Sequence, residues 1–96
     1  MSDNSEKPLK GAIDQLLRAY GLGEKLDEIS LVKSWEETVG KMIARHTTNI
    51  YFKSGTLHIS LDSAPLRHEL SLAKTKLIER LNQQAGKRLV VDIRLN

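Results

Sequence analysis

Seven lysines and arginines stand at spacings that could hold nucleic-acid phosphates. Lys41 and Arg45 are four residues apart, so they share one stripe of a helix, and Arg67 and Lys74 share another at a spacing of seven. The full set comprises Lys41, Arg45, Lys53, Arg67, Lys74, Lys87 and Arg88. Such cations bind phosphates with little regard to base identity. The alternative is that they serve only as ion-pair partners and solubilising charge.

The charge of the chain is unevenly distributed along its length. Its 15 Lys and Arg exceed its 12 Asp and Glu by three. Residues 1–40 hold five basic and eight acidic residues, whereas residues 41–96 hold ten and four. A basic half permits a polyanion partner, DNA or RNA, without requiring one.

Patterns that support catalysis or metal binding are missing from the sequence. There is no cysteine, and His46, His58 and His68 lack the spacing of metal ligands. Neither a G-x-S-x-G nucleophile motif nor a phosphate-binding G-x-x-x-x-G-K-[ST] loop occurs. The neighbouring Glu36 and Glu37 are more typical of a solvated helix face than of a catalytic acid–base pair. The sequence predicts a protein that is not an enzyme, with no cofactor, metal or small-molecule substrate.

The segments that position these residues follow clear periodicities. Apolar residues recur at helical spacing over 8–20 and 24–45, and again over 63–86, where Ser63 and Pro65 mark a start and Gly86 a stop. Residues 48–53, 57–62 and 89–95 alternate as strands do. The predicted fold is α+β in the order ααββαβ, with a three-stranded sheet covered by helices on one face.

Strand alternation also predicts the register of the hairpin. A turn at Ser54-Gly55 pairs Phe52 with Leu57 and Ile50 with Ile59 on one face, and Tyr51 with His58 on the other. Tyr51 is the only one of the four Tyr, Trp and Phe residues expected to point outward. A base-stacking sheet of the RNA-recognition type is therefore disfavoured.

The apolar stripes of these segments define a predicted core. Its members are Trp35, Val39, Gly40, Phe52, Leu57, Ile59, Leu70 and Leu77. Gly40 interrupts a helical pattern, which predicts either a close approach by another element or a local kink. In the last strand, Leu89, Val91, Ile93 and Leu95 are expected to face inward.

The combination of these motifs resembles the DciA family. The resemblance rests on W-x-x-x-V-G at residues 35–40, His46-Thr47, and the hairpin with "GTLHISLDS". It continues through "LRHEL" and "LIERLN" to the terminal strand, from about Leu9 to Leu95. It implies a bacterial KH-like domain without enzymatic activity that associates with the replicative DNA helicase and binds DNA. Many members carry a flexible extension, whereas this chain stops at Asn96, so a short form is expected.

Two other interpretations remain open at this stage. The KH-like fold and the basic charge also suit an RNA- or ribosome-associated protein, although the G-x-x-G loop that clamps the nucleic-acid backbone is missing. A pure protein-interaction module is the third interpretation. In each case we expect a disordered tail at residues 1–6, one domain over 7–96, no membrane contact and a cytoplasmic location.

Overall fold

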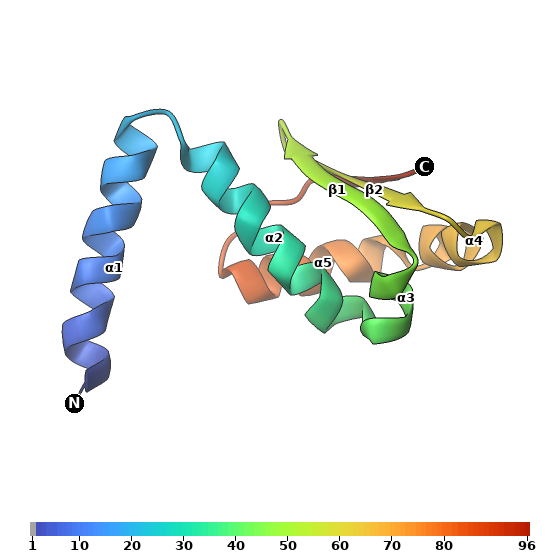
Figure 1. Ribbon diagram of the computed structural model, residues 1–96, viewed down its shortest axis with the longest axis horizontal. Coiled ribbons are helices and arrows are strands. Elements are labelled where there is room, and N and C mark those ends of the chain that lie inside the picture. The colour runs from blue at the N-terminus through green and yellow to red at the C-terminus, as the bar shows by residue number, and fades with distance from the viewer. Residues whose placement is uncertain (1) are drawn as a thin grey trace.

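The computed structural model describes residues 2–96, and their side chains from Gly11 onward. Three helices, a hairpin, two further helices and a final strand follow one another along the chain (Figure 1). The elements are α1 (Ser2–Ala19), α2 (Gly23–Val39), α3 (Lys41–Arg45), β1 (Thr47–Lys53), β2 (Thr56–Leu61), α4 (Ala64–Leu72), α5 (Lys74–Ala85) and β3 (Asp92–Leu95).

The three strands form a single mixed sheet, which confirms the α+β class. The strand order is β1-β2-β3, with β1 antiparallel and β3 parallel to β2. Helices α2 and α5 lie together on one side of this sheet (Figure 1). Helix α1 includes residues 2–6, where a disordered tail was expected. The division into a tail and a domain stays a prediction. The KH-like character of the fold stays a prediction as well.

The predicted hairpin register is confirmed in every pair. Phe52 is paired with Leu57, Ile50 with Ile59, and Tyr51 with His58. Ser54 and Gly55 both have positive φ, at 51° and 81°. Two such residues form the kind of tight turn whose twist matches that of the strands it joins.

The start of β1 differs from the predicted alternation because the strand contains a bulge. The register shifts between Thr47 and Asn49, so Thr48 has no partner in the ladder. Thr47 is partly buried and Thr48 is exposed, whereas unbroken alternation from Phe52 and Ile50 would place Thr48 on the inner face. An extra residue in one strand reverses the facing of the residues before it.

Two of the predicted helices are each divided in two. The segment 24–45 breaks at Gly40, which has φ 88° and ψ 167°, a conformation that only glycine adopts easily. Nothing lies within 4 Å of a Cβ added there, so the glycine provides the kink and not a close approach. The segment 63–86 breaks at Ala73, which has φ −104° and ψ 13°. No glycine or proline at this position indicates the break. Ser63 accepts a hydrogen bond from the Leu66 amide, and Gly86 ends α5, as predicted.

The core lies between the inner face of the sheet and helices α2, α4 and α5. Trp35 is 1 % exposed, and its indole nitrogen donates a hydrogen bond to Thr47 Oγ1 at 3.0 Å. Thr47 in turn donates to the Ile43 carbonyl. Of the predicted core, Val39 is partly buried and Gly40 is exposed. The buried residues are Leu31, Trp35, Phe52, Leu57, Ile59, Leu61, Leu70, Leu77, Leu81, Val90 and Ile93.

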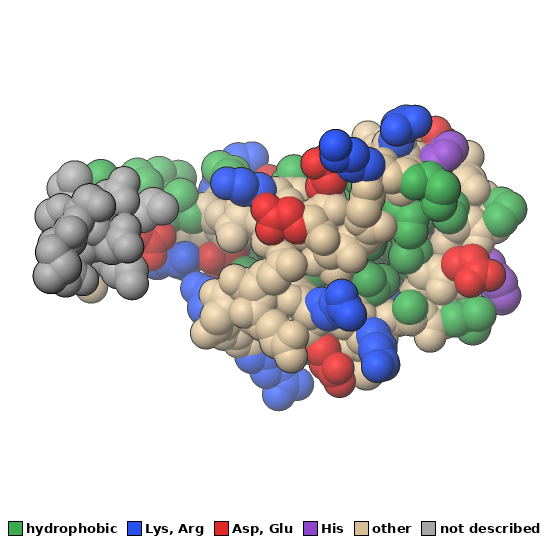
Figure 2. All heavy atoms as spheres, turned by 90° about the horizontal axis from the view of Figure 1, so that it is seen from below, with side chains coloured by type: hydrophobic (Ala, Val, Ile, Leu, Met, Phe, Trp, Pro, Cys, Tyr) green, Lys and Arg blue, Asp and Glu red, His purple; other side chains and the backbone are tan. Residues whose placement is uncertain are grey.

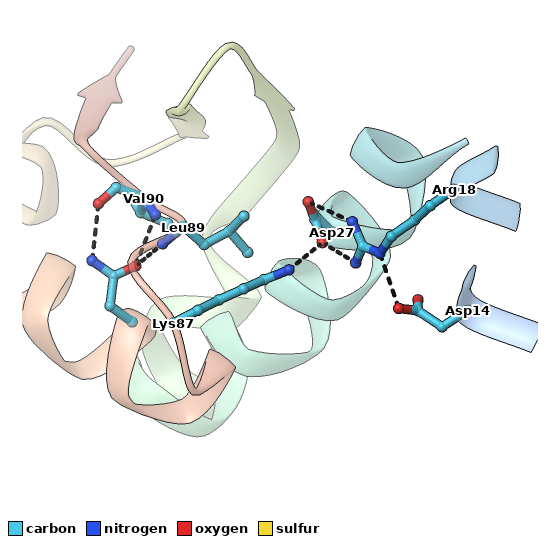
Figure 3. A network of polar contacts seen from close by, with 7 residues as sticks. Asp14, Arg18, Asp27, Lys87, Leu89 and Val90 are labelled. Atoms are coloured by element: carbon cyan, nitrogen blue, oxygen red, sulfur yellow. Dashed lines mark hydrogen bonds and ion pairs between the residues drawn. The ribbon is translucent and has the colours of Figure 1, made fainter. Parts of the chain in front are cut away.

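The predicted alternation over 89–95 is wrong in its first half. Strand β3 begins only at Asp92; before it, Val90 is fully buried while Val91 is 63 % exposed. The Asn82 side chain accepts hydrogen bonds from the amides of Leu89 and Val90 and donates one to the Val90 carbonyl (Figure 3). The backbone here follows one side chain of α5 and not a neighbouring strand.

Candidate nucleic-acid interface

The short helix α3 carries two of the predicted phosphate-binding residues, Lys41 and Arg45. Both are exposed, one helical turn apart. Among the described side chains, neither makes an ion pair with a carboxylate. Their positive charge is therefore available to an external anion.

Arg67 has a structural partner that the sequence did not reveal. Its guanidinium donates a hydrogen bond to the Leu61 carbonyl at 2.7 Å, and the residue is partly buried. The contact joins α4 to the end of β2. A hydrogen bond from a charged donor to a partly buried carbonyl stabilises the fold, so removing Arg67 alters more than surface charge.

Two more of the predicted cations face carboxylates of the protein itself. Lys74 Nζ lies 3.8 Å from Asp92 Oδ1, and Lys87 Nζ lies 3.7 Å from Asp27 Oδ1. Lys53 and Arg88 are exposed and make no such pair in the described part of the chain. The seven cations thus divide into free, paired and hydrogen-bonded groups.

Lys87 belongs to an ionic network that ties α1 to the rest of the molecule (Figure 3). Arg18 donates to Asp14 at 2.9 Å and to Asp27 at 2.8 Å and 3.5 Å. Burial alone would raise the pKa of Asp27, but the Arg18 and Lys87 cations outweigh it and hold that pKa below its ordinary value. The same carboxylates raise the pKa of Arg18. The network therefore holds α1, α2 and the segment after α5 together.

The seven predicted cations are distributed over five parts of the fold. They lie on α3, the end of β1, α4, the start of α5 and the segment after α5. In Figure 2, basic side chains are interspersed with acidic and neutral ones over the side of the molecule that it shows. The structure therefore provides several small basic positions.

The free edge of strand β1 is partly occupied by carboxylates of α2. Glu28 accepts a hydrogen bond from the Phe52 amide at 2.9 Å, and Glu24 accepts one from the Ser54 amide at 3.3 Å. The Phe52 amide, with a smaller contribution from Lys25, holds the pKa of Glu28 below its ordinary value. Further along the strand, a hollow of about 350 Å³ lies between β1 and helices α2 and α3. Occupied edge amides protect the strand from pairing with another chain.

The face of the sheet turned away from α2 and α5 carries a stacked pair of rings. The rings of Tyr51 and His58 are parallel within 5°, with centroids 4.3 Å apart. Arg94 is the partner of His58 in β3, so the three residues form one row across the strands. Sequence reasoning omitted all three residues from the candidate site and disfavoured a base-stacking sheet. The predicted Tyr51–His58 pairing was the available signal.

The described side chains contain no cluster of three or more His, Asp or Glu suited to a metal ion. His46 Nδ1 lies 2.8 Å from Asp62 Oδ1, and the Asp62 amide donates to the His46 carbonyl. The pair joins the start of β1 to the end of β2. One imidazole and one carboxylate are too few for a metal site of the usual kind.

Comparison with known proteins identifies one family over most of the chain. A family model with the description "Dna[CI] antecedent, DciA" matches residues 8–95. The chain belongs to the DciA family. The match covers α1 from Pro8 onward, the other helices, the hairpin and the final strand.

Curated relatives of this DciA-family chain are similar over nearly its whole length. A UPF0232 protein of Mycolicibacterium smegmatis is 24 % identical over 94 residues, which are 97 % of this chain and 48 % of the relative. A UPF0232 protein of Corynebacterium glutamicum is 23 % identical over 87 residues, which are 91 % of this chain and 49 % of the relative. The chain spans about half the length of these relatives. Among the described residues, no helix has the length and apolar character needed to cross a membrane.

Proposed function

We propose that the protein is a non-enzymatic adaptor of DNA replication that binds the replicative DNA helicase and DNA. The observation that carries this proposal is the DciA family match over residues 8–95. The helicase partner follows from what that family implies. A role inside the cell, in the bacterial cytoplasm, belongs to the same proposal.

DNA contact is supported by the cations that the fold leaves without a carboxylate partner. Lys41, Arg45, Lys53 and Arg88 are exposed and make no ion pair among the described side chains. Arg67, Lys74 and Lys87 contact the protein itself and contribute less to an external phosphate. We therefore place the sequence-independent DNA contacts mainly on the four free residues.

A salt titration tests the DNA half of the proposal. Affinity for a labelled oligonucleotide is measured from low to moderate salt for the wild type and the double variant Lys41→Ala/Arg45→Ala. For each phosphate that the variant no longer binds, the log–log salt slope should shrink by about 0.7 on single strands and about 0.9 on duplex. The matched control Lys25→Ala/Lys33→Ala also removes two positive charges, but from the acidic half, and should keep the wild-type slope.

A pull-down with the purified replicative helicase of the same organism tests the other half. The helicase should be retained by the immobilised wild-type protein. If the wild type retains no helicase, the adaptor role is wrong. If it binds no DNA even at low salt, the DNA contact is wrong.

A further inference from the structure

We propose that Tyr51, His58 and Arg94 form a base-stacking site for single-stranded DNA on the open face of the sheet. The inference rests on the DNA binding proposed above and assigns a site to it. It places recognition of bases on a surface separate from the cations of α3. Arg94, absent from the seven predicted cations, becomes part of the interface.

The geometry of the rings supports stacking of one more flat group. Tyr51 lies on the edge strand β1 and is 40 % exposed, with His58 parallel to it on the central strand. One ring face of Tyr51 is against His58, which leaves the other turned toward the sheet edge. A nucleobase placed there would extend an existing stack. Aromatic side chains on sheets are used in this way for single strands because every base has a π-face.

Charges on the same face favour a polyanion. Lys53 follows Tyr51 by two residues, so it lies on the same side of β1, and Arg94 lies beside His58. Neither pairs with a carboxylate among the described side chains. Two acidic groups of this face, Asp92 and Asp62, have partners in Lys74 and His46. At the edge of β1, the carboxylates of Glu28 and Glu24 accept hydrogen bonds from the Phe52 and Ser54 amides. Arg94 therefore places positive charge beside the rings and Lys53 places it further along β1, where the two cations can offset the edge carboxylates.

The same arrangement predicts a preference for single strands over duplex. Bases in a duplex are stacked on one another and paired, so their faces are not available to an aromatic side chain. Phosphates, in contrast, are available in both forms. The stacked pair should therefore add affinity for single strands only, while Lys53 and Arg94 act on both.

The experiment compares binding of a fluorescently labelled thymidine 20-mer and a 20-base-pair duplex by anisotropy. Tyr51→Ala should weaken single-strand binding about tenfold, in line with the loss of one stacked base. Duplex binding should stay within about twofold. Tyr51→Phe keeps the ring and should bind like the wild type. Tyr20→Ala removes a tyrosine that is 75 % exposed beyond the end of α1 and serves as the matched control.

A second variant guards against loss of folding. Tyr51→Thr removes the ring while keeping a residue with high strand propensity, and thermal unfolding checks its fold. If folded Tyr51→Ala or folded Tyr51→Thr binds the 20-mer as the wild type does, the stacking site is wrong while DNA binding stands. If the wild type binds neither oligonucleotide, the failure lies in the proposed function itself. Equal weakening on both oligonucleotides would also overturn the stacking site, since it indicates a purely electrostatic surface.

Discussion

The two faces of the sheet consist of the same three strands but differ in nearly every physical property. On the inner face, Leu57, Ile59 and Ile93 are fully buried beneath helices. On the outer face, Tyr51, His58 and Arg94 form a polar and aromatic row at the matching register. Because side chains alternate along a strand, each residue belongs to one face only. Residues of the outer face can therefore be changed without altering the core.

The largest effect on stability is expected from a residue buried between the helices and the inner face of the sheet. Trp35→Ala should lower the free energy of unfolding by about 3–5 kcal/mol, as truncation of a buried aromatic does. Urea unfolding measures it. Trp35→Phe retains most of the ring but loses the hydrogen bond to Thr47, so its effect should be smaller. An unchanged melting temperature with abolished DNA binding would make Trp35 a recognition residue and break the comparison.

A smaller loss is expected where the fold fixes the third strand. Asn82→Ala removes three hydrogen bonds with Leu89 and Val90 and leaves buried backbone groups without partners. The cost should be about 1–3 kcal/mol by chemical denaturation. Its exposed neighbour Gln83 provides the control, since Gln83→Ala should change stability by less than about 0.5 kcal/mol. Equal stability of the two variants would show that the segment does not depend on Asn82.

The helical layer should also respond to acid. The pKa of Asp27 is below its ordinary value of 3.8 in the folded protein. The stabilisation is therefore complete above that ordinary value and is lost as pH falls through the lower folded pKa. Between about pH 5 and pH 2, wild-type stability should fall more steeply than that of Asp27→Asn, while Glu37→Gln should follow the wild type. Parallel curves for wild type and Asp27→Asn would remove the Arg18–Asp27 contact from the stability of the fold.

The smallest change in stability is expected on the open face. Arg94→Ala should alter the free energy of unfolding by less than about 0.5 kcal/mol, because the side chain is exposed and makes no ion pair among the described residues. Thermal and urea unfolding provide the check. A destabilisation comparable to that of Asn82→Ala would show that the outer row supports the fold, and the distinction between the faces would disappear.

Prediction from sequence succeeded where periodicity and turn chemistry agree. The hairpin register followed from alternation on both sides of Ser54-Gly55, because a slip by one residue would turn every apolar side chain outward. The ends marked by Ser63 and Gly86 were correct for the same reason: each residue type satisfies backbone groups at a helix end.

Sequence reasoning failed where a tertiary contact overrides the local pattern. Val90 is buried and Val91 exposed because Asn82, seven and eight residues before Leu89 and Val90, binds the backbone of both. An asparagine on a helix carries no sign of such a role. The break at Ala73 likewise has no local signal.

Prediction of the candidate site was limited because charge says nothing about partners. Lys41 and Lys87 look alike in the sequence, yet packing places Lys87 near Asp27 and gives Lys41 no carboxylate partner among the described side chains. Arg67 likewise donates a hydrogen bond to the Leu61 carbonyl, which no pattern in the sequence indicates. The position of Arg94 beside the Tyr51–His58 pair could be predicted only by knowing that β3 pairs in parallel with β2. That pairing depends on how α4 and α5 carry the chain back to the sheet.

The parallel pairing of β3 with β2 also bears on the order in which the protein folds. The hairpin closes through neighbouring residues and can form in microseconds, whereas β3 must wait until α4 and α5 have brought it to the sheet. Until then, β2 has one edge without a partner, with Leu57 and Ile59 incompletely covered. A chain emerging from the ribosome therefore passes through a stage at which this apolar edge is open to association with other chains.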